Sequence, residues 1–495
     1  MSVPRQVVDV MISCVCGCEC LADEQVQMKA VRTLQTAVMS EPSYVHGASL
    51  LLCVRTCCNV FLGSHSTPNQ TAAKGALSQM MSAMMKRMEA ASAAVPDTQS
   101  SSKIPEGAEE LQTMEQRDVF EVFSRLCKLS MKFDLVDSWV KSDEAMNMQS
   151  KVLALELLLE MLNQCGPSLR NSAQFVACIR QNLCMSLLKN GVSSVQRVFK
   201  ASLQVFSTLM LHFKTHLKQE IGVFFTTIFL RILESPNSTF YQKIMVIQLL
   251  HNMCKDPQTM VDIYVNYDCD LKHIDIFAKM LNQLTRIVQS GIQYAPASTP
   301  ITPEQDQQLR SRGTEALVAL LESLLRWSKV VGKDVVFLDN GEMVPRSLVA
   351  EDSASGEANG GTPLQRNRSP RSRDDGENGD IGIEALVIKQ KEQKTQLQQG
   401  IKAFNIKPKK GLELLVQGGH VEKSHEGVAS FFHNTPVLDK KAVGEYMGEG
   451  DDFNKGVLYA YVDAMCFEGM TIDGALRHFL SGFWLPGGRR RRSIG

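Results

Sequence analysis

The sequence predicts an all-α protein built as an armadillo- or HEAT-like α-solenoid. Three observations lead to this prediction. Aromatic residues make up only 6% of the 495 residues, whereas Leu, Met, Ala and Gln abound, and this balance favours helix–helix packing over β-sandwiches. Apolar residues recur at helical spacing through much of the middle of the chain. The breaks between these stripes are short, so that successive helices are expected to lie antiparallel.

Three apolar stripes show the helical spacing most clearly. They comprise Val152, Leu155, Leu159 and Leu162, then Phe199, Leu203, Phe206, Met210 and Phe213, and then Ile221, Phe225, Ile228 and Ile232. Each set falls on one face of a helix. The breaks at 166–168 and 235–238 contain proline and cap-forming residues, and they predict where one helix ends and the next begins.

The overall composition excludes several classes of protein. Hydrophobic residues make up 44% and charged residues 21%, which argues against collagen-like, mucin-like or wholly disordered chains. The 53 basic residues balance the 53 acidic ones, so no global field attracts nucleic acid, and no nucleic-acid partner is expected. The longest apolar runs, such as 221–230, are about half as long as a membrane helix, so the chain is not expected to span a membrane.

Three stretches of different composition divide the chain. Residues 90–103 and 293–307 are interpreted as polar loops between helical blocks. Residues 351–380 contain Leu364 as their only large apolar side chain and are expected to form a disordered linker. Arginines within this linker flank Ser369-Pro370; they are interpreted as a solvated tether, with phosphorylation or contact with an anionic surface as alternatives. A separate helical segment begins near Ile383.

The cysteines and the known catalytic motifs give little indication of chemistry. Cys14, Cys16, Cys18 and Cys20 suit a soft metal, but on a helix Cys14 and Cys18 share one face while Cys16 and Cys20 point elsewhere, so the four thiolates cannot converge. Buried or half-buried reduced thiols are therefore favoured and no metal site is predicted. The sequence contains no phosphate-binding loop, no dinucleotide-binding glycine motif, no zinc-protease helix and no serine-nucleophile elbow. Neither nucleotide hydrolysis nor a cofactor is expected.

The most distinctive polar motif is a box of five residues, Asn266, Tyr267, Asp268, Cys269 and Asp270. It lies between a helix expected to carry Ile247 and Leu250 and a helix expected to carry Ile274, Phe277, Leu281 and Leu284. As local structure the box predicts a turn in which Asp268 or Asp270 caps the following helix. Its carboxylates, amide and phenol also suit the attachment of a loop to another domain.

Three motifs near the end of the chain resemble the opening of the Sec-seven guanine-nucleotide exchange domain. They are FNIKPKKGLELLVQGG at 404–419, FNKGVLYAYVD at 453–463 and ALRHFLSGFWLPG at 475–487. Upstream, the box at 266–270 matches the box of the homology-upstream region of large ARF exchange factors, and residues 31–89 resemble their N-terminal dimerisation and cyclophilin-binding domain. Residues 120–132 and 317–329 are similar to the brefeldin A-inhibited subgroup, of which the chain is identified as a member.

The resemblance implies a domain order. A dimerisation and cyclophilin-binding region would occupy 1–135, a homology-upstream region 140–345, the linker 350–382, the first part of a Sec-seven domain 385–487, and an atypical basic tail 488–495. For the box, the resemblance implies contact between the homology-upstream and N-terminal domains. The family also implies ARF GTPases as partners, self-association through the N-terminal region, and a cytoplasmic protein peripherally attached to Golgi, trans-Golgi and endosomal membranes, where it regulates vesicle transport.

The resemblance also implies where exchange activity would reside. In this family, a motif matching Phe483, Leu485, Pro486 and Gly487 leads to a catalytic glutamate, whose carboxylate repels the β-phosphate of GDP on ARF. Here Gly488 occupies that position and four arginines, 489–492, follow. This reverses the sign of the local charge, so no catalytic residue is assigned and exchange activity is not expected of this chain.

Other interpretations apply to the end of the chain and to the function. The helices from Leu412 to Phe483 are expected to lack packing partners and to be partly molten. The tail is interpreted as an alternative short form or as coding sequence read past an exon, with a nuclear signal or a membrane-surface patch as alternatives. For function, the alternative is a helical-repeat scaffold that only binds partners. The Sec-seven motifs disfavour a generic HEAT-like transport factor.

Overall fold

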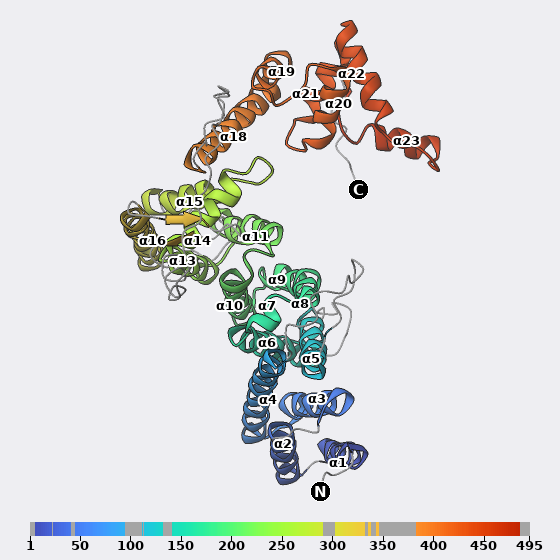
Figure 1. Cartoon of the computed structure of the whole chain (residues 1–495), viewed down its shortest axis with the longest axis vertical. Helices are drawn as coiled ribbons and strands as arrows, with labels where there is room; N and C mark the ends of the chain where they lie inside the picture. The colour runs from blue at the N-terminus through green and yellow to red at the C-terminus, as the bar shows by residue number, and fades with distance from the viewer. Residues whose placement is uncertain are drawn as a thin grey trace, which may run out of the picture. The chain divides into compact units, whose positions relative to one another are not determined.

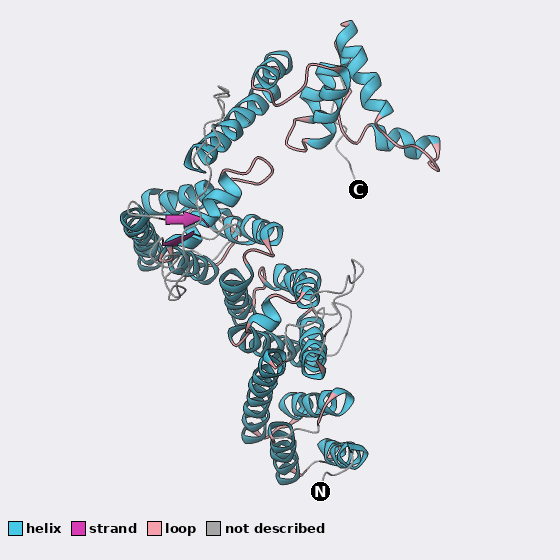
Figure 2. Cartoon of the chain, viewed as in Figure 1, coloured by secondary structure: helices cyan, strands magenta, loops and turns pink. Residues whose placement is uncertain are grey.

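The structure is a computed structural model of the chain. It describes residues 5–21, 23–40, 45–94, 111, 113–131, 141–290, 302–331, 335–337, 343–345 and 383–485. The chain divides into two compact units, the first formed by residues 1–260 and 278–350 and the second by residues 261–277 and 351–495. Figures 1 and 2 show that helices dominate both units, which confirms the predicted all-α class.

The first unit begins with five helices and a short 3₁₀ turn. They are α1 (Arg5–Gly17), the 3₁₀ turn Cys18–Cys20, α2 (Glu24–Met39), α3 (Gly47–Gly63), α4 (Thr67–Ala93) and α5 (Met114–Ser130). Helices α2 and α3 both pack against α4. Asp23 caps α2, and a capping box of Thr113 and Gln116 starts α5. Because α4 runs to Ala93, the polar loop predicted from residue 90 is wrong for its first residues; residues 95–103 lie outside the described residues.

The middle of the first unit contains the three predicted apolar stripes. Its elements are α6 (Lys141–Asn163), α7 (Pro167–Arg170), α8 (Ala173–Cys178), a π-turn (Ile179–Leu183), α9 (Cys184–Asn190), α10 (Gln196–Phe213), α11 (Lys218–Phe224), a π-turn (Phe225–Leu230), α12 (Arg231–Glu234) and α13 (Phe240–Cys254). Helix α10 packs against α6 and α13. All stripe residues are buried except the half-buried Leu159, and the breaks at 166–168 and 235–238 separate helices as predicted.

The remaining elements before the second helical segment are α14 (Pro257–Ile263), a π-turn (Tyr264–Asp268), α15 (Ile276–Ser290) and α16 (Pro303–Val331). Helix α16 packs against α13. The polar loop predicted at 293–307 is wrong at its end, because residues from Pro303 onward are helical. A small antiparallel hairpin of β1 (Val335–Phe337) and β2 (Met343–Pro345) pairs Val336 with Val344, a feature the sequence did not predict.

The second unit contains α18 (Ile383–Ile406), α19 (Pro408–Gln417), α20 (His425–Asn434), α21 (Lys440–Gly448), α22 (Asp452–Asp463) and α23 (Ile472–Phe479). Phe404, Leu415, Phe432, Val457 and Phe483 belong to one buried cluster that joins these helices. The predicted helical segment from Ile383 is therefore confirmed. The linker predicted at 351–380 lies outside the described residues.

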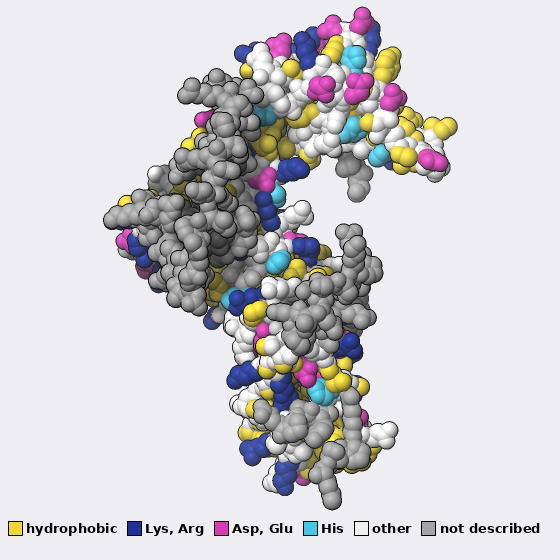
Figure 3. Space-filling view, viewed as in Figure 1, with side chains coloured by type: hydrophobic (Ala, Val, Ile, Leu, Met, Phe, Trp, Pro, Cys, Tyr) yellow, Lys and Arg dark blue, Asp and Glu magenta, His cyan; other side chains and the backbone are white. Residues whose placement is uncertain are grey.

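The sequence predicts no membrane-spanning helix and no global excess of charge. Within the described residues, none of the helices combines the length and apolar character that crossing a bilayer requires. On the face shown in Figure 3, basic side chains are interspersed with acidic and apolar ones.

Candidate functional site at the Asn266–Asp270 box

The box comprises the last three residues of the π-turn Tyr264–Asp268 and the first two residues of the loop that follows it. Asp268 is fully buried, and its Oδ2 accepts a hydrogen bond of 2.8 Å from the backbone N–H of Phe277 in the first turn of α15. Asp268 therefore caps α15, as predicted for an aspartate of the box, but it does so from nine residues before Phe277 and not from the N-cap position. Helix α15 starts at Ile276, so Ile274, which the sequence assigned to this helix, lies before it and is exposed.

The other box residues divide between an inner and an outer side. Tyr267 and Cys269 are buried, and the Tyr267 ring meets the His273 ring edge-on at 5.6 Å. Asn266 is exposed and its Nδ2 donates to the Asp262 carbonyl at 3.0 Å. The Asp270 Oδ1 accepts from the Lys272 N–H at 2.9 Å. The inner three residues build the turn, whereas the outer two stabilise its flanks.

Helix α18 supplies a buried cation to this turn. The Lys394 side chain is 3% exposed, and its Nζ donates to the carbonyls of Tyr267 at 2.5 Å and His273 at 2.6 Å. The same Nζ lies 2.8 Å from Asp275 Oδ1. The carbonyl groups and the carboxylate therefore surround the ammonium with acceptors, which offsets the cost of removing it from water.

Two neighbours on the same face of α18 extend the contact. Lys391 Nζ donates to the Asp268 carbonyl at 2.9 Å and lies 5.6 Å from the centre of the Tyr264 ring. Gln398 Nε2 donates to Asp275 Oδ2 at 2.8 Å. Residues 391, 394 and 398 are spaced i, i+3 and i+7, so one helix face presents all three side chains to the turn.

The local electrostatics follow from this arrangement. Burial raises the pKa of the Asp275 carboxyl, but the hydrogen bonds from Lys394 and Gln398 and the nearby Lys charges outweigh burial, so its pKa lies below the usual range. Burial likewise raises the pKa of the Cys269 thiol, so this cysteine stays protonated at neutral pH. The box and its loop therefore hold α18 through an ion pair and backbone carbonyls, and this site contains no activated nucleophile.

The contact with the N-terminal domain that the resemblance implied for the box stays a prediction. Within the second unit, the Asp268 carboxylate is fully buried and accepts from the N–H of Phe277. The described partner of the box is α18. Sequence reasoning missed Lys391, Lys394, Gln398 and Asp275, because a Lys- and Gln-rich helix is usually a solvated one.

The first Sec-seven motif, 404–419, is explained by packing between α18 and α19. Pro408 occupies the first turn of α19, where a missing N–H costs nothing. A Cβ on Gly411 would collide with the backbone of Phe404, so only glycine allows α19 to lie this close to α18. Lys409 Nζ lies 2.8 Å from Glu449 and 2.9 Å from Asp451.

The last motif is only partly described. Phe483 is buried and its ring meets the Phe479 and Tyr461 rings edge-on at 5.0 Å and 5.8 Å. Leu485 is 58% exposed. Pro486, Gly487, Gly488 and the arginines at 489–492 lie outside the described residues. None of the residues of α23 is buried, and its Ile472 is 83% exposed. The expected exposure of apolar faces in 412–483 therefore applies to α23, whereas helices α19 to α22 share a core.

The Cys14–Cys20 run lies at the end of α1 and in the 3₁₀ turn after it. Cys16 is buried, Cys18 is half-buried, and Cys14 and Cys20 are exposed. The helix directs the thiols to different sides, as its geometry requires. Within the described part of the chain, no group of three or more His, Cys, Asp or Glu side chains is placed to hold a metal ion.

Comparison with known proteins assigns these segments. Residues 1–92 match the family model of the Mon2/Sec7/BIG1-like dimerisation and cyclophilin-binding domain. Residues 115–276 match the model of the Mon2/Sec7/BIG1-like HUS domain. Residues 393–492 match the model of the Sec7 domain. The order of the three matches agrees with the order implied by the sequence motifs, and the HUS match includes the box.

Two relatives illustrate the similarity along the chain. Brefeldin A-inhibited guanine nucleotide-exchange protein 1 of Homo sapiens is 41% identical over 383 residues, which cover 75% of this chain and 20% of that protein. Brefeldin A-inhibited guanine nucleotide-exchange protein 2 of Arabidopsis thaliana is 33% identical over 595 aligned residues, covering 96% of this chain and 32% of that protein. The chain thus spans a fifth to a third of these relatives. It belongs to the family of brefeldin A-inhibited guanine nucleotide-exchange proteins, which carry a Sec7 domain.

Proposed function

We propose that the chain is the regulatory region, together with the opening of the exchange domain, of an ARF guanine-nucleotide exchange factor in Golgi and endosomal transport. The names of the relatives and the order of the three matched domains support this proposal. ARF-family GTPases are the proposed partners. The chain is also proposed to self-associate through its dimerisation domain and to attach peripherally to Golgi and trans-Golgi membranes.

The observation that carries the regulatory part is the contact of Lys394 with the box. The Sec7 match begins at residue 393, inside α18, and α18 continues to Ile406 in the first Sec7 motif. The box therefore holds the very helix that leads into the exchange segment. We propose that the box can be either bound to α18 or released from it. A partner that binds one of these two states more tightly would shift the equilibrium toward that state, by an amount set by its difference in affinity.

Nucleotide exchange depends on the charge at position 488 and in the residues after it. A carboxylate placed against the β-phosphate of bound GDP raises the energy of the nucleotide complex by charge repulsion. Gly488 supplies no carboxylate at the position where the family has its glutamate, and the arginines at 489–492 carry the opposite charge. The chain is therefore proposed to bind its GTPase partners without releasing their nucleotide.

A fluorescence experiment with the full chain tests both parts. ARF is loaded either with a fluorescent non-hydrolysable GTP analogue or with fluorescent GDP, and the chain is titrated into each sample in the presence of Golgi-like vesicles. We expect a saturable rise in anisotropy with the GTP analogue and an unchanged rate of GDP release, with Mg²⁺ chelation as the positive control for release. Absence of binding would contradict the docking proposal, and accelerated release would contradict the inactivity of this chain.

A further inference from the structure

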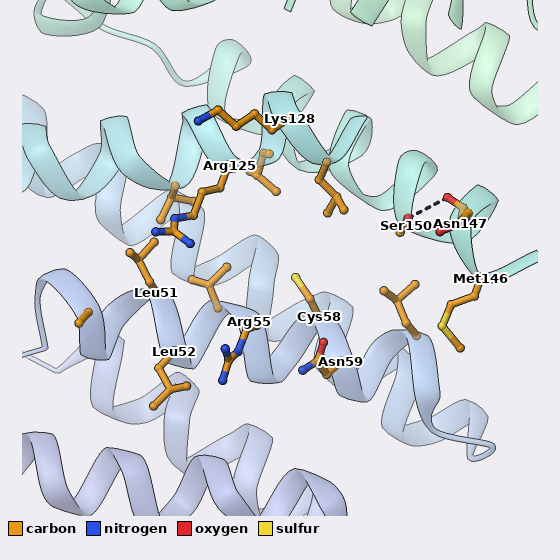
Figure 4. A pocket seen from close by; sticks show the side chains of 16 residues that line it. Leu51, Leu52, Arg55, Cys58, Asn59, Arg125, Lys128, Met146, Asn147 and Ser150 are labelled. Carbon is orange, nitrogen blue, oxygen red and sulfur yellow. Dashed lines mark hydrogen bonds between the residues drawn. The ribbon is translucent and has the colours of Figure 1, made fainter. Parts of the chain in front are cut away.

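A second candidate site lies in the first unit, away from the box. A groove of about 800 Å³ runs between α3 and α5 and reaches the start of α6. Leu51, Leu52, Leu62 and Leu129 are half-buried in it, and Met146 at its end is 47% exposed. Figure 4 shows Leu51 and Leu52 on α3 and Met146 on α6 around this space. Apolar side chains left partly accessible in a concave surface are typical of a binding groove.

The charged residues of the groove are all basic. Arg55 comes from α3, Arg125 and Lys128 come from α5, and none of the lining residues is acidic. Glu121 already pairs with Arg125, with a distance of 2.7 Å between Nη2 and Oε1. Among the residues that the structure describes, neither Arg55 nor Lys128 forms an ion pair, so these two cations, which flank the apolar floor, are available to a ligand. This charge distribution complements an acidic ligand.

The polar side chains of the groove argue against a small molecule. Asn59 Nδ2 donates to Glu19 Oε1 at 3.2 Å, and Ser150 Oγ donates to the Asn147 carbonyl at 2.7 Å. These groups are satisfied within the protein, so they do not converge on a ligand in the way that small-molecule sites require. Burial raises the pKa of the Cys58 thiol in the groove to about 12, so it is not a nucleophile at neutral pH.

The walls determine what backbone the ligand must have. Both long walls are helices, α3 and α5, whose interior N–H and C=O groups are bonded within each helix. An extended peptide would find no strand edge to pair with, whereas a helix satisfies its own backbone and inserts a row of apolar side chains. We propose that this groove binds an amphipathic helix of a partner protein, with apolar residues at i, i+4 and i+7 and acidic residues on both sides of that stripe.

Synthetic helical peptides of about four turns test this proposal against the full chain. One peptide has a leucine stripe flanked by glutamates, the second has the same stripe flanked by lysines, and the third has the first composition in scrambled order. Anisotropy of the labelled peptides gives their Kd. We expect saturable binding of the acidic helix, at least about ten-fold tighter than that of the other two, weakening as salt rises from about 0.05 M to about 0.3 M.

Charge reversal on the groove identifies the site. The double variant Arg55→Glu/Lys128→Glu changes two exposed side chains and is expected to raise the Kd of the acidic peptide at least about ten-fold. Lys86→Glu, an exposed lysine on α4, is the matched control and should change the Kd less than about two-fold. Unchanged circular dichroism of the variants shows that they are folded. A photoreactive group at the central leucine should crosslink to peptides from α3, α5 or the start of α6.

Four outcomes would overturn the proposal. These are no saturable binding of the acidic helix, equal affinity for acidic and basic helices, an unchanged Kd in the double variant, and crosslinks outside the groove. The remaining alternative is that a second copy of this chain occupies the groove. Light scattering tests it by measuring the oligomeric state of the wild type and the double variant. If the double variant turned a dimer into a monomer while its peptide affinity stayed the same, that alternative would replace the partner helix.

Discussion

The carboxylate of Asp275 and the ammonium of Lys394 lie 2.8 Å apart, although one belongs to the loop before α15 and the other to α18. Only 3% of the Lys394 side chain and 19% of the Asp275 side chain are exposed. Because α18 leads into the Sec7-matching segment, this ion pair connects the last residues of the HUS match with the first residues of the Sec7 match. The contact is local in space but distant in sequence.

Asp275→Asn is expected to lower the stability of the second unit by about 1–2 kcal/mol at neutral pH, because Lys394 loses its countercharge. The folded-state pKa of Asp275 lies below the unfolded value of about 4. Its contribution is therefore fully present above about pH 4 and is lost as the pH falls through the folded-state pKa. Urea-dependent proteolysis, followed on peptides from 387–463, measures the stability of the second unit. The stabilities of wild type and variant should become equal in acid.

The control for this prediction is Asp473→Asn. Asp473 pairs with Arg477, but both side chains are more than three-quarters exposed. Such a pair contributes little, so this variant should differ from wild type by less than about 0.5 kcal/mol. A stability difference for Asp275→Asn that stayed constant down to pH 2 would show that the ion pair is not its cause.

Gly411→Ala is expected to destabilise the second unit by about 2 kcal/mol, since a methyl group would force α19 away from the Phe404 backbone. Gly75→Ala in α4 is the matched comparison. A Cβ on Gly75 would meet no atom within 4 Å, so alanine should stabilise α4 by up to about 1 kcal/mol through helix propensity. Thermal unfolding checks both signs, and a stabilised Gly411→Ala variant would refute the close approach of the two helices.

Lys243→Met is expected to destabilise the first unit by about 2 kcal/mol. Lys243 is fully buried, and its Nζ donates to the carbonyls of Ile232, Leu233 and Ser235 at 2.9, 3.2 and 2.7 Å. Methionine matches the volume but leaves these acceptors at the end of α12 without their donor. Urea denaturation followed by circular dichroism measures the loss, with the exposed Lys255→Met as the control.

The same residue gives a prediction for alkaline pH. Burial lowers the pKa of Lys243 to about 8 from 10.5, so between these values the unfolded chain binds more protons than the folded chain. The contribution of Lys243 to stability therefore rises with pH across this window. The stability gap between wild type and Lys243→Met should widen from pH 8 to pH 10, and a gap that narrowed would contradict the lowered pKa.

Asp118→Ala is expected to cost about 2 kcal/mol in the first unit, because Asp118 ties α5 to the beginning of α3. Its Oδ1 accepts from the Gly47 N–H at 2.8 Å, and its Oδ2 lies 2.7 Å from His46 Nδ1. Asp118→Asn keeps one acceptor oxygen and should lose less. Thermal unfolding of the two variants gives the order, and equal stability of both variants and wild type would exclude this contact as a support of α3.

The sequence was sufficient to predict features that depend on local periodicity and capping. The stripe from Phe199 to Phe213 marks the buried face of α10 because helical spacing and burial coincide there. Asp268 was recognisable as a candidate helix cap from its residue type, although its carboxylate accepts from the Phe277 N–H nine residues further along the chain. The domain boundaries at 135, 140 and 345 stay predictions.

The contacts of α18 could not be predicted in this way. Lys391, Lys394 and Gln398 have the composition of a solvated helix face, and only the arrangement in three dimensions brings them to Asp275 and the carbonyls of the box. The end of α4 was misassigned for a related reason. Residues 90–93 are Ala-Ala-Ser-Ala, which favour a helix and continue α4, but they were grouped with the Ser-, Pro- and Gln-containing residues that follow them.

Hydrogen exchange of Lys394→Met, followed peptide by peptide in the full chain, tests most directly whether the box holds α18. Lys402→Met, an exposed lysine on the same helix, is the control. We predict faster exchange in 263–277 and 387–400 for Lys394→Met, unchanged exchange in α2 to α5, and no effect of Lys402→Met. Exchange in 263–277 that is the same in Lys394→Met as in wild type would contradict the claim that this lysine joins the box to the helix entering the Sec7 segment.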